Sequence, residues 1–131
     1  MDDDKKLTFP KNERISWKRH LDLLFTEGNS FVAYPLRIIY LPLKKGDSGS
    51  AVSVVTSVSK KKFKHAVDRN KIKRRIRESY RLRKHELIDH ISQKESSLLI
   101  AFLYLSKEKA SFETIDKAIN KTIHSLINKY E

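Results

Sequence analysis

Residues 60–84 constrain the fold most, because this segment is both strongly basic and patterned like a helix. It holds thirteen basic residues against two acidic ones, Asp68 and Glu78, and so carries +11 of the formal net charge of +12. The basic residues are Lys60, Lys61, Lys62, Lys64, Arg69, Lys71, Lys73, Arg74, Arg75, Arg77, Arg81, Arg83 and Lys84. The rest of the chain is close to neutral, so the positive charge is a local property.

A helix is predicted from about Arg69 onward, where Gly and Pro are lacking, with Asp68 as the cap at its start. At about 100° per residue, four apolar side chains form one stripe: Ile72, Ile76, Tyr80 and Leu87. The neighbouring face collects Asn70, Lys73, Arg74, Arg77, Arg81 and Lys84. The stripe is therefore expected to anchor the helix on a core and to leave the basic face outward.

Three interpretations of this basic face are open: a solvated surface, a membrane-surface helix, and a nucleic-acid interface. Solvated helices mix Lys with Glu, whereas here acidic partners are few and Arg, whose planar fork suits phosphate, is abundant. A membrane-surface helix would have to turn its apolar stripe to lipid and leave the core. Because so many like charges repel one another, a bound phosphate chain that neutralises them is favoured. The pattern thus indicates a nucleic-acid partner.

Hydrophobic periodicity predicts the other elements. They are a helix around residues 17–25, strands over 31–43, 51–59 and 98–105, and a final helix from about residue 111. Ser16 is expected to cap the first helix and Gly28 to end it, while Pro35 and Pro42 indicate an edge or a bulge in the first strand. The almost wholly apolar third strand should be covered on both faces. The order helix, strand, strand, helix, strand, helix indicates an α+β fold, a two-layer sandwich.

Length and composition exclude several classes of protein. The 131 residues fit one domain, residues 1–131, of which 1–8 are expected to be disordered. Cysteine is absent, and no apolar run is long enough to cross a bilayer or to serve as a signal peptide, which favours a cytoplasmic protein. His85 and His90 lie five residues apart and project about 140° apart on a helix, so they cannot share a metal. We expect no metal site and no catalytic residue in the protein.

Two stretches resemble the signature of bacterial ribonuclease P proteins. They are Ser57-Val-Ser-Lys-Lys61 and residues 66–78, which read AVDRNKIKRRIRE. The family has a similar strand end, followed by a helix with the RNR motif that reads approximately AVxRNRIKRxxRE. The resemblance implies a fold like ribosomal protein S5 domain 2, with a left-handed crossover through the basic helix where general rules predict a right-handed one.

The resemblance also implies the partners: the catalytic RNA of ribonuclease P and precursor tRNA with its 5′ leader, with no membrane and no obligate protein partner. The expected contacts with the catalytic RNA are Lys60, Lys61, Lys62, Arg69, Asn70, Lys71, Arg74, Arg75 and Arg81. The expected leader contacts are Phe25, Tyr34, Tyr40, Lys73 and Arg77. Alternation leaves open which tyrosine faces a cleft, and packing is an equal alternative for each. The chain would be the accessory subunit of an endoribonuclease whose Mg²⁺ ions are bound mainly by the RNA.

Three positions depart from the family pattern. Lys71 replaces the second Arg of the motif, which keeps the attraction to phosphate but loses bidentate contacts. Leu21 stands where the family often has an aromatic residue, and residues 62–65 lack a common glycine. The alternatives are a ribosomal or other structural RNA-binding protein without a leader cleft, and a stand-alone ribonuclease.

Overall fold

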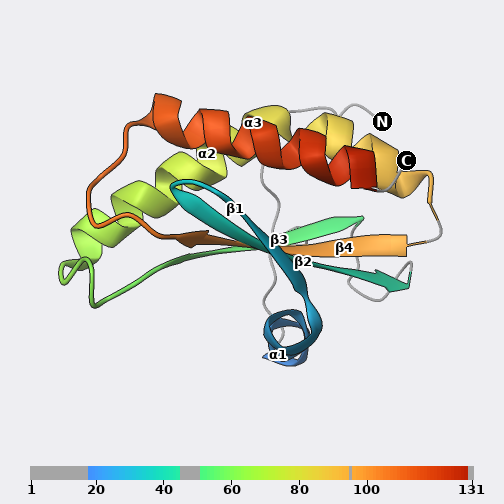
Figure 1. Cartoon of the computed structure of the whole chain (residues 1–131), viewed down its shortest axis with the longest axis horizontal. Helices are drawn as coiled ribbons and strands as arrows, with labels where there is room; N and C mark the ends of the chain where they lie inside the picture. Colours follow the sequence, from blue (N-terminus) through green and yellow to red (C-terminus); the bar gives the residue numbers. More distant parts are fainter. Residues whose placement is uncertain (1–17, 45–50, 95, 130–131) are drawn as a thin grey trace.

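The computed structural model describes residues 18–44, 51–94 and 96–129. Within these ranges the chain forms three helices and a four-stranded sheet (Figure 1). The elements in chain order are α1 (Lys18–Glu27), β1 (Asn29–Ala33), β2 (Leu36–Lys44), β3 (Val52–Val58), α2 (Ala66–Ser92), β4 (Ser96–Tyr104) and α3 (Phe112–Lys129). The predicted cap Ser16 and residues 1–8 lie outside the described residues.

The sheet has the strand order β1-β2-β4-β3. β2 pairs antiparallel with both β1 and β4, whereas β3 and β4 are parallel neighbours joined by the long helix α2. Because the carboxyl ends of β3 and β4 lie at the same edge of the sheet, the loops that follow them meet there. The left hand of the β3-α2-β4 connection stays a prediction of the resemblance.

The helices cover the two faces of the sheet unequally. Figure 1 shows α2 and α3 side by side over one face and α1 on the other. The main core lies under α2 and α3, and the stripe predicted for the basic helix (Ile72, Ile76, Tyr80, Leu87) is buried in it. On the other face, Leu24 of α1 packs with Leu99 and Ala101 of β4 in a smaller cluster. β4 is therefore covered on both faces, as its apolar sequence predicts. The α+β fold is confirmed: the sheet and the layer of α2 and α3 form the predicted sandwich, and α1 adds a short helix on the other face.

The segment predicted as one strand over residues 31–43 is a hairpin of β1 and β2. A turn at Tyr34 and Pro35, joined by a cis peptide bond, divides it. Both halves show the apolar alternation of strands, which is why the sequence alone suggested one continuous strand. Pro35 was expected to mark an edge or a bulge, but it lies in the turn where the chain reverses direction.

The predicted cap of the basic helix was also wrong. α2 begins at Ala66 and its N-cap is His65, whose side chain makes no capping hydrogen bond. Asp68 lies in the first turn, where a carboxylate is favoured by the helix dipole, and its Oδ1 accepts from Lys109 Nζ at 3.0 Å. The prediction that Gly28 ends the first helix holds, since α1 stops at Glu27.

Candidate nucleic-acid interface

The flank of α2 that faces α3 is occupied by contacts within the protein. Arg75 Nη1 donates to Ala110 O at 2.7 Å, in the loop before α3. Ser79 Oγ donates to Asp116 Oδ1 at 2.6 Å, and Arg83 donates to both oxygens of the same carboxylate at 2.7 and 2.6 Å. The basic side chains on this flank therefore hold the two helices together.

The opposite flank of α2 borders the edge strand β3, and we call it the outer flank. By helical projection it carries Asn70, Lys73, Arg74, Arg77 and Arg81. Asn70, Arg74 and Arg77 are exposed, and Lys73 and Arg81 are half-buried. These five side chains were predicted to share one face, and on the continuous helix α2 the same projection groups them again.

Lys84 was predicted on the same outward face, and this was wrong. Its side chain is only 2% exposed and lies among the largest buried side chains of the protein. It follows Tyr80 by four residues and so lies one turn further along the buried side of α2.

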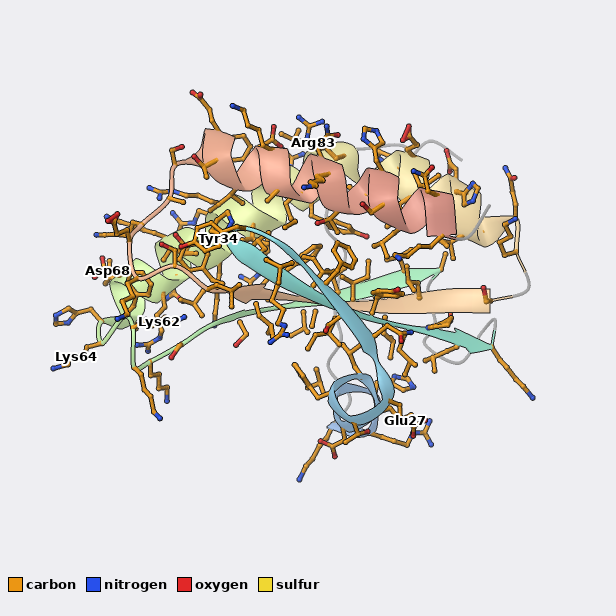
Figure 2. All side chains as sticks on the ribbon, viewed as in Figure 1. Glu27, Tyr34, Lys62, Lys64, Asp68 and Arg83 are labelled. Carbon is orange, nitrogen blue, oxygen red and sulfur yellow. The ribbon has the colours of Figure 1, made fainter. Side chains whose placement is uncertain are left out.

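The loop between β3 and α2 adds further positive charge next to the start of α2. Lys60, Lys61, Lys62 and Lys64 are all exposed there, although Lys62 Nζ also donates to Leu105 O at 2.5 Å. Figure 2 shows Lys62, Lys64 and Asp68 together at one end of the molecule. This loop and the outer flank thus form one continuous basic region.

Three of the arginines expected to contact RNA already bind groups of the protein. Arg69 Nη1 donates to two backbone carbonyls, and Arg75 binds Ala110 O as described. Arg81 pairs with Glu78, with Nε to Oε1 at 3.0 Å and Nη2 to Oε2 at 2.5 Å. Lys71 and Arg74, in contrast, are exposed at the surface.

Ion pairing keeps the nearby carboxyl groups charged. The hydrogen bond from Arg81 lowers the pKa of Glu78, and the hydrogen bond from Lys109 lowers the pKa of Asp68. The pKa of Asp116 is lowered first by the hydrogen bond from Arg83 and then by that from Ser79, against the opposing effect of burial. All three carboxylates are therefore ionised at neutral pH.

Among the described residues, α1 covers only part of its face of the sheet. The register aligns one residue from each strand in a row: Val32 beside Arg37, Arg37 beside Leu103, and Leu103 beside Ser57. Arg37 and Ser57 are exposed, Leu103 is half-buried, and Val32 is 52% exposed. We call this row the open row.

The open row lies at the basic end of the sheet. Further along the strands, the same face is closed where Leu24 of α1 packs on Leu99 and Ala101. In the opposite direction, toward the basic end of the sheet, the next residues after the row are the turn at Tyr34 and the loop that starts after Val58. Within the part of the chain that the structure describes, an exposed apolar and cationic strip thus adjoins the basic loop.

Sequence reasoning did not select Val32, Arg37 or Leu103 as site residues. Arg37 is the one charged residue in the otherwise apolar stretch 36–43, and this was the available signal. This isolated charge points to a site only once residues 31–43 are known to form a hairpin, because the register of that hairpin places Arg37 in the open row.

The aromatic residues expected to bind the leader are placed differently from one another. Phe25 on α1 is 49% exposed and Tyr34 at the hairpin turn is 68% exposed. Tyr40 is 8% exposed and packs edge-on against Phe31, with Lys129 of α3 over its ring. Tyr40 therefore lies on the face covered by α3, away from α1, and we withdraw it from the expected leader contacts.

Residues 18–44, 51–94 and 96–129 contain no group of three or more His, Cys, Asp or Glu side chains placed to hold a metal ion. Among the helices in these ranges, none combines the length and the apolar character needed to cross a bilayer.

The sequence profile of the family described as Ribonuclease P matches residues 9–127. The chain belongs to the ribonuclease P protein family. Protein components of ribonuclease P bind RNA and take part in tRNA processing, which agrees with the basic region on α2 and its loop.

Relatives of known identity extend this likeness. The chain is 39% identical over 113 residues to the ribonuclease P protein component of Porphyromonas gingivalis, covering 86% of this chain and 82% of that protein. It is 31% identical over 125 residues to the protein component of Chlorobium phaeobacteroides, covering 88% and 86% of the two chains.

Solved structures of ribonuclease P proteins share the fold. The protein from Thermotoga maritima superposes with a TM-score of 0.64 at 23% identity, covering 86% of this chain and 96% of that one. The protein from Staphylococcus aureus superposes with a TM-score of 0.63 at 19% identity, covering 91% and 98%. The strand order and the α2 crossover described above thus belong to a known architecture.

Proposed function

We propose that this chain is the protein subunit of bacterial ribonuclease P and that it has two RNA surfaces. Asn70, Arg74 and Arg81 of the outer flank bind the catalytic RNA together with the loop before α2. The open row of the sheet binds the 5′ leader of precursor tRNA, with Lys73 and Arg77 of the outer flank beside it. The observation that carries the proposal is the junction of these two surfaces at one end of the molecule. The reaction that we propose is endonucleolytic maturation of the tRNA 5′ end, and we propose the cytoplasm, where bacterial tRNA is made, as its location.

The surface for the catalytic RNA is supported by charge and exposure. Lys60, Lys61, Lys71 and Arg74 are exposed and closely spaced around the start of α2. Neutralising phosphates with such side chains releases counterions, which favours binding at moderate salt. Because α2 is anchored by its buried stripe, these charges are held on a rigid element.

The surface for the leader is supported by its mixed chemistry. Single-stranded RNA is held by cations that follow the backbone and by apolar or aromatic side chains that contact the bases. The open row offers Val32 and Leu103 as an apolar floor and Arg37 as a cation, with exposed Tyr34 at the adjoining turn. Lys73 and Arg77 lie on the outer flank, on the side of β3, the last strand of the described sheet, and would bind leader phosphates.

The residues around these surfaces do not fit a protein-bound Mg²⁺ ion. Mg²⁺ prefers carboxylate, carbonyl and water oxygens, whereas every charged side chain of the outer flank and of the open row is a Lys or an Arg. Glu78, the carboxylate beside the outer flank, is engaged by Arg81. We therefore assign the metal ions and the hydrolysis itself to the RNA subunit, and to this chain the binding and alignment of the substrate and the neutralisation of phosphate charge.

The test replaces Arg37 with Ala and measures the affinity of the reconstituted holoenzyme for precursor tRNA and for mature tRNA. Loss of one phosphate or base contact is expected to weaken binding of the leader-bearing precursor by about tenfold and to leave mature tRNA unchanged. Lys44→Ala, an exposed charge at the other end of the same strand, is the matched control and should change neither affinity.

Equal losses for both RNAs in Arg37→Ala would contradict a leader surface. That outcome would instead favour a structural RNA-binding protein without selectivity for the leader.

A further inference from the structure

Arg69, the first arginine of the RNR motif, uses one nitrogen of its guanidinium to bind the protein backbone. Its Nη1 donates to Phe63 O at 2.8 Å and to Lys64 O at 2.9 Å. This nitrogen carries two hydrogens, and the two carbonyls use both of them. The Arg69 side chain is half-buried, unlike its exposed neighbours Asn70 and Lys71.

The two carbonyls belong to the loop that presents the lysines next to α2. The loop is also tied at its beginning, where Phe63 N donates to Ser59 O at 3.1 Å and Lys61 N donates to Ser59 Oγ at 3.1 Å. The ring of Phe63 is buried against Tyr104, with ring centroids 6.0 Å apart. Arg69 thus closes the loop at its far end, between the buried Phe63 and the first turn of α2.

The closed loop directs charge outward. Lys60, Lys61 and Lys64 are exposed, while the backbone between them is held by Ser59 and Arg69. A loop ordered before binding avoids the conformational entropy that a flexible lysine-rich loop would lose on meeting RNA.

We propose that Arg69 is a positioning residue, which acts on RNA affinity by holding residues 60–64 in the conformation that presents their lysines. This assignment differs from the direct RNA contact that the resemblance implies for Arg69. It rests on the proposed function only in naming RNA as the partner, because the loop contacts belong to the protein alone.

The first experiment measures hydrogen exchange of backbone amides in the protein without RNA. Arg69→Lys keeps the charge, but an ammonium group on a different stem cannot reproduce the planar donor that spans both carbonyls. We expect the amides of Lys61 and Phe63 to exchange about tenfold faster in Arg69→Lys, which corresponds to one lost charge-assisted hydrogen bond.

Two controls accompany this measurement. Lys71→Ala removes a charge from the same turn without touching the loop, and it should leave the exchange of Lys61 and Phe63 unchanged. The amide of Ile76, within α2, should exchange alike in all three proteins and so report that the helix is intact. Unchanged loop amides in Arg69→Lys would overturn the proposal.

The second experiment is a double-mutant cycle on binding to the cognate ribonuclease P RNA. The loop variant carries Lys60→Ala, Lys61→Ala and Lys64→Ala together. If Arg69 acts through the loop, Arg69→Lys weakens binding about tenfold in the wild-type background and less than about threefold in the loop variant, because the lysines it presents are gone. A direct phosphate contact would give equal losses in the two backgrounds, and that result would overturn the proposal.

Arg74→Ala is the comparison in the same cycle. Its exposed side chain is expected to act independently of the loop, so its effect should be the same in both backgrounds. Failure of the proposed function would give a different result from failure of this inference. Wild-type protein would not stimulate cleavage of precursor tRNA, but Arg69→Lys would still speed the hydrogen exchange of the Lys61 and Phe63 amides.

Discussion

The basic side chains of α2 and of the loop before it all carry a positive charge, but they make different contacts. Lys62, Arg69 and Arg75 bind backbone carbonyls, whereas Lys71 and Arg74 face solvent. The first group shapes the surface and the second is available to phosphate. A count of charges therefore does not separate the basic side chains that are bound within the protein from those that are exposed.

Lys73 and Arg77 are expected to act on the leader. Lys73→Ala and Arg77→Ala should each weaken binding of leader-bearing precursor more than binding of mature tRNA. Each should also flatten the dependence of log affinity on log salt by about one unit, because one phosphate contact is lost. Filter binding over a series of salt concentrations measures both effects.

Lys121→Ala is the control for these two variants, since Lys121 is exposed on α3, away from both RNA surfaces. Equal losses for precursor and mature tRNA in Arg77→Ala would remove the leader assignment.

Gly28 is required by close packing where α1 meets the sheet. A Cβ at this position would lie 2.4 Å from Leu24 O and 2.7 Å from Ile39 Cγ2. Gly28→Ala is therefore expected to lower the free energy of unfolding by about 1–3 kcal/mol, because backbone must move to relieve the overlap. Urea denaturation measures the change, with Asn29→Ala, at the exposed neighbouring position, as the control. Equal stability of Gly28→Ala and wild type would show that α1 is not held as described.

Residue patterns predicted the buried stripe of α2 but not the fate of Lys84 or Tyr40. A helical projection assigns Lys84 to the border of the basic face, and only the packing of the sheet decides that this border is covered. The alternation along β2 shows which residues share a face with Tyr40, but it does not show which of the two faces is covered by α3. Such positions depend on contacts between elements that are distant in sequence.

At the scale of elements, α2 and α3 are joined by a polar clasp centred on Asp116. Its carboxylate accepts from Ser79 and twice from Arg83, and Arg83 Nη1 also donates to Asn120 Oδ1 at 3.1 Å. The clasp fixes α3 against α2, and α3 in turn covers β1 and β2. It thereby holds the helix that presents the RNA surface.

The clasp predicts a dependence of stability on pH. The pKa of Asp116 is lowered in the folded protein, chiefly by the hydrogen bond from Arg83, so its contribution is present above the unfolded value near 3.8 and is lost as pH falls through the folded value. Asp116→Asn should therefore lower the free energy of unfolding by about 1 kcal/mol at pH 7, and the difference from wild type should shrink below about pH 4.

Denaturation at a series of pH values tests this prediction. Asp89→Asn, an exposed acid on the same helix pair, is the control and should track wild type throughout. A difference between Asp116→Asn and wild type that stays constant from pH 7 to pH 3 would contradict the clasp.

The type of most elements was predictable, because apolar periodicity separates α2, α3 and β4 clearly. The hairpin of β1 and β2 was not, since Pro35 fits both an irregular strand and a turn. The open row depends on that hairpin, because Val32 and Arg37 become neighbours only after the chain reverses at Tyr34. The proposed leader surface could therefore be predicted only in part from the sequence, whereas most of the basic surface could be predicted from it.

The whole molecule brings two surfaces of different chemistry to one end. The parallel pairing of β3 and β4 places the lysine-rich loop there, and the hairpin of β1 and β2 brings Tyr34 and Arg37 to the same end. An RNA bound along α2 and a single strand lying on the open row would thus be held close together. Under the proposed function, this arrangement would let the protein align a precursor tRNA on the catalytic RNA.

The most direct test is reconstitution of precursor tRNA cleavage from the cognate RNA at low Mg²⁺, with and without the protein. We predict that wild-type protein stimulates cleavage at the mature 5′ end, that the protein without RNA cleaves nothing, and that Arg37→Ala loses stimulation for leader-bearing precursor. Absence of stimulation by the wild-type protein, or cleavage by the protein alone, would contradict the account.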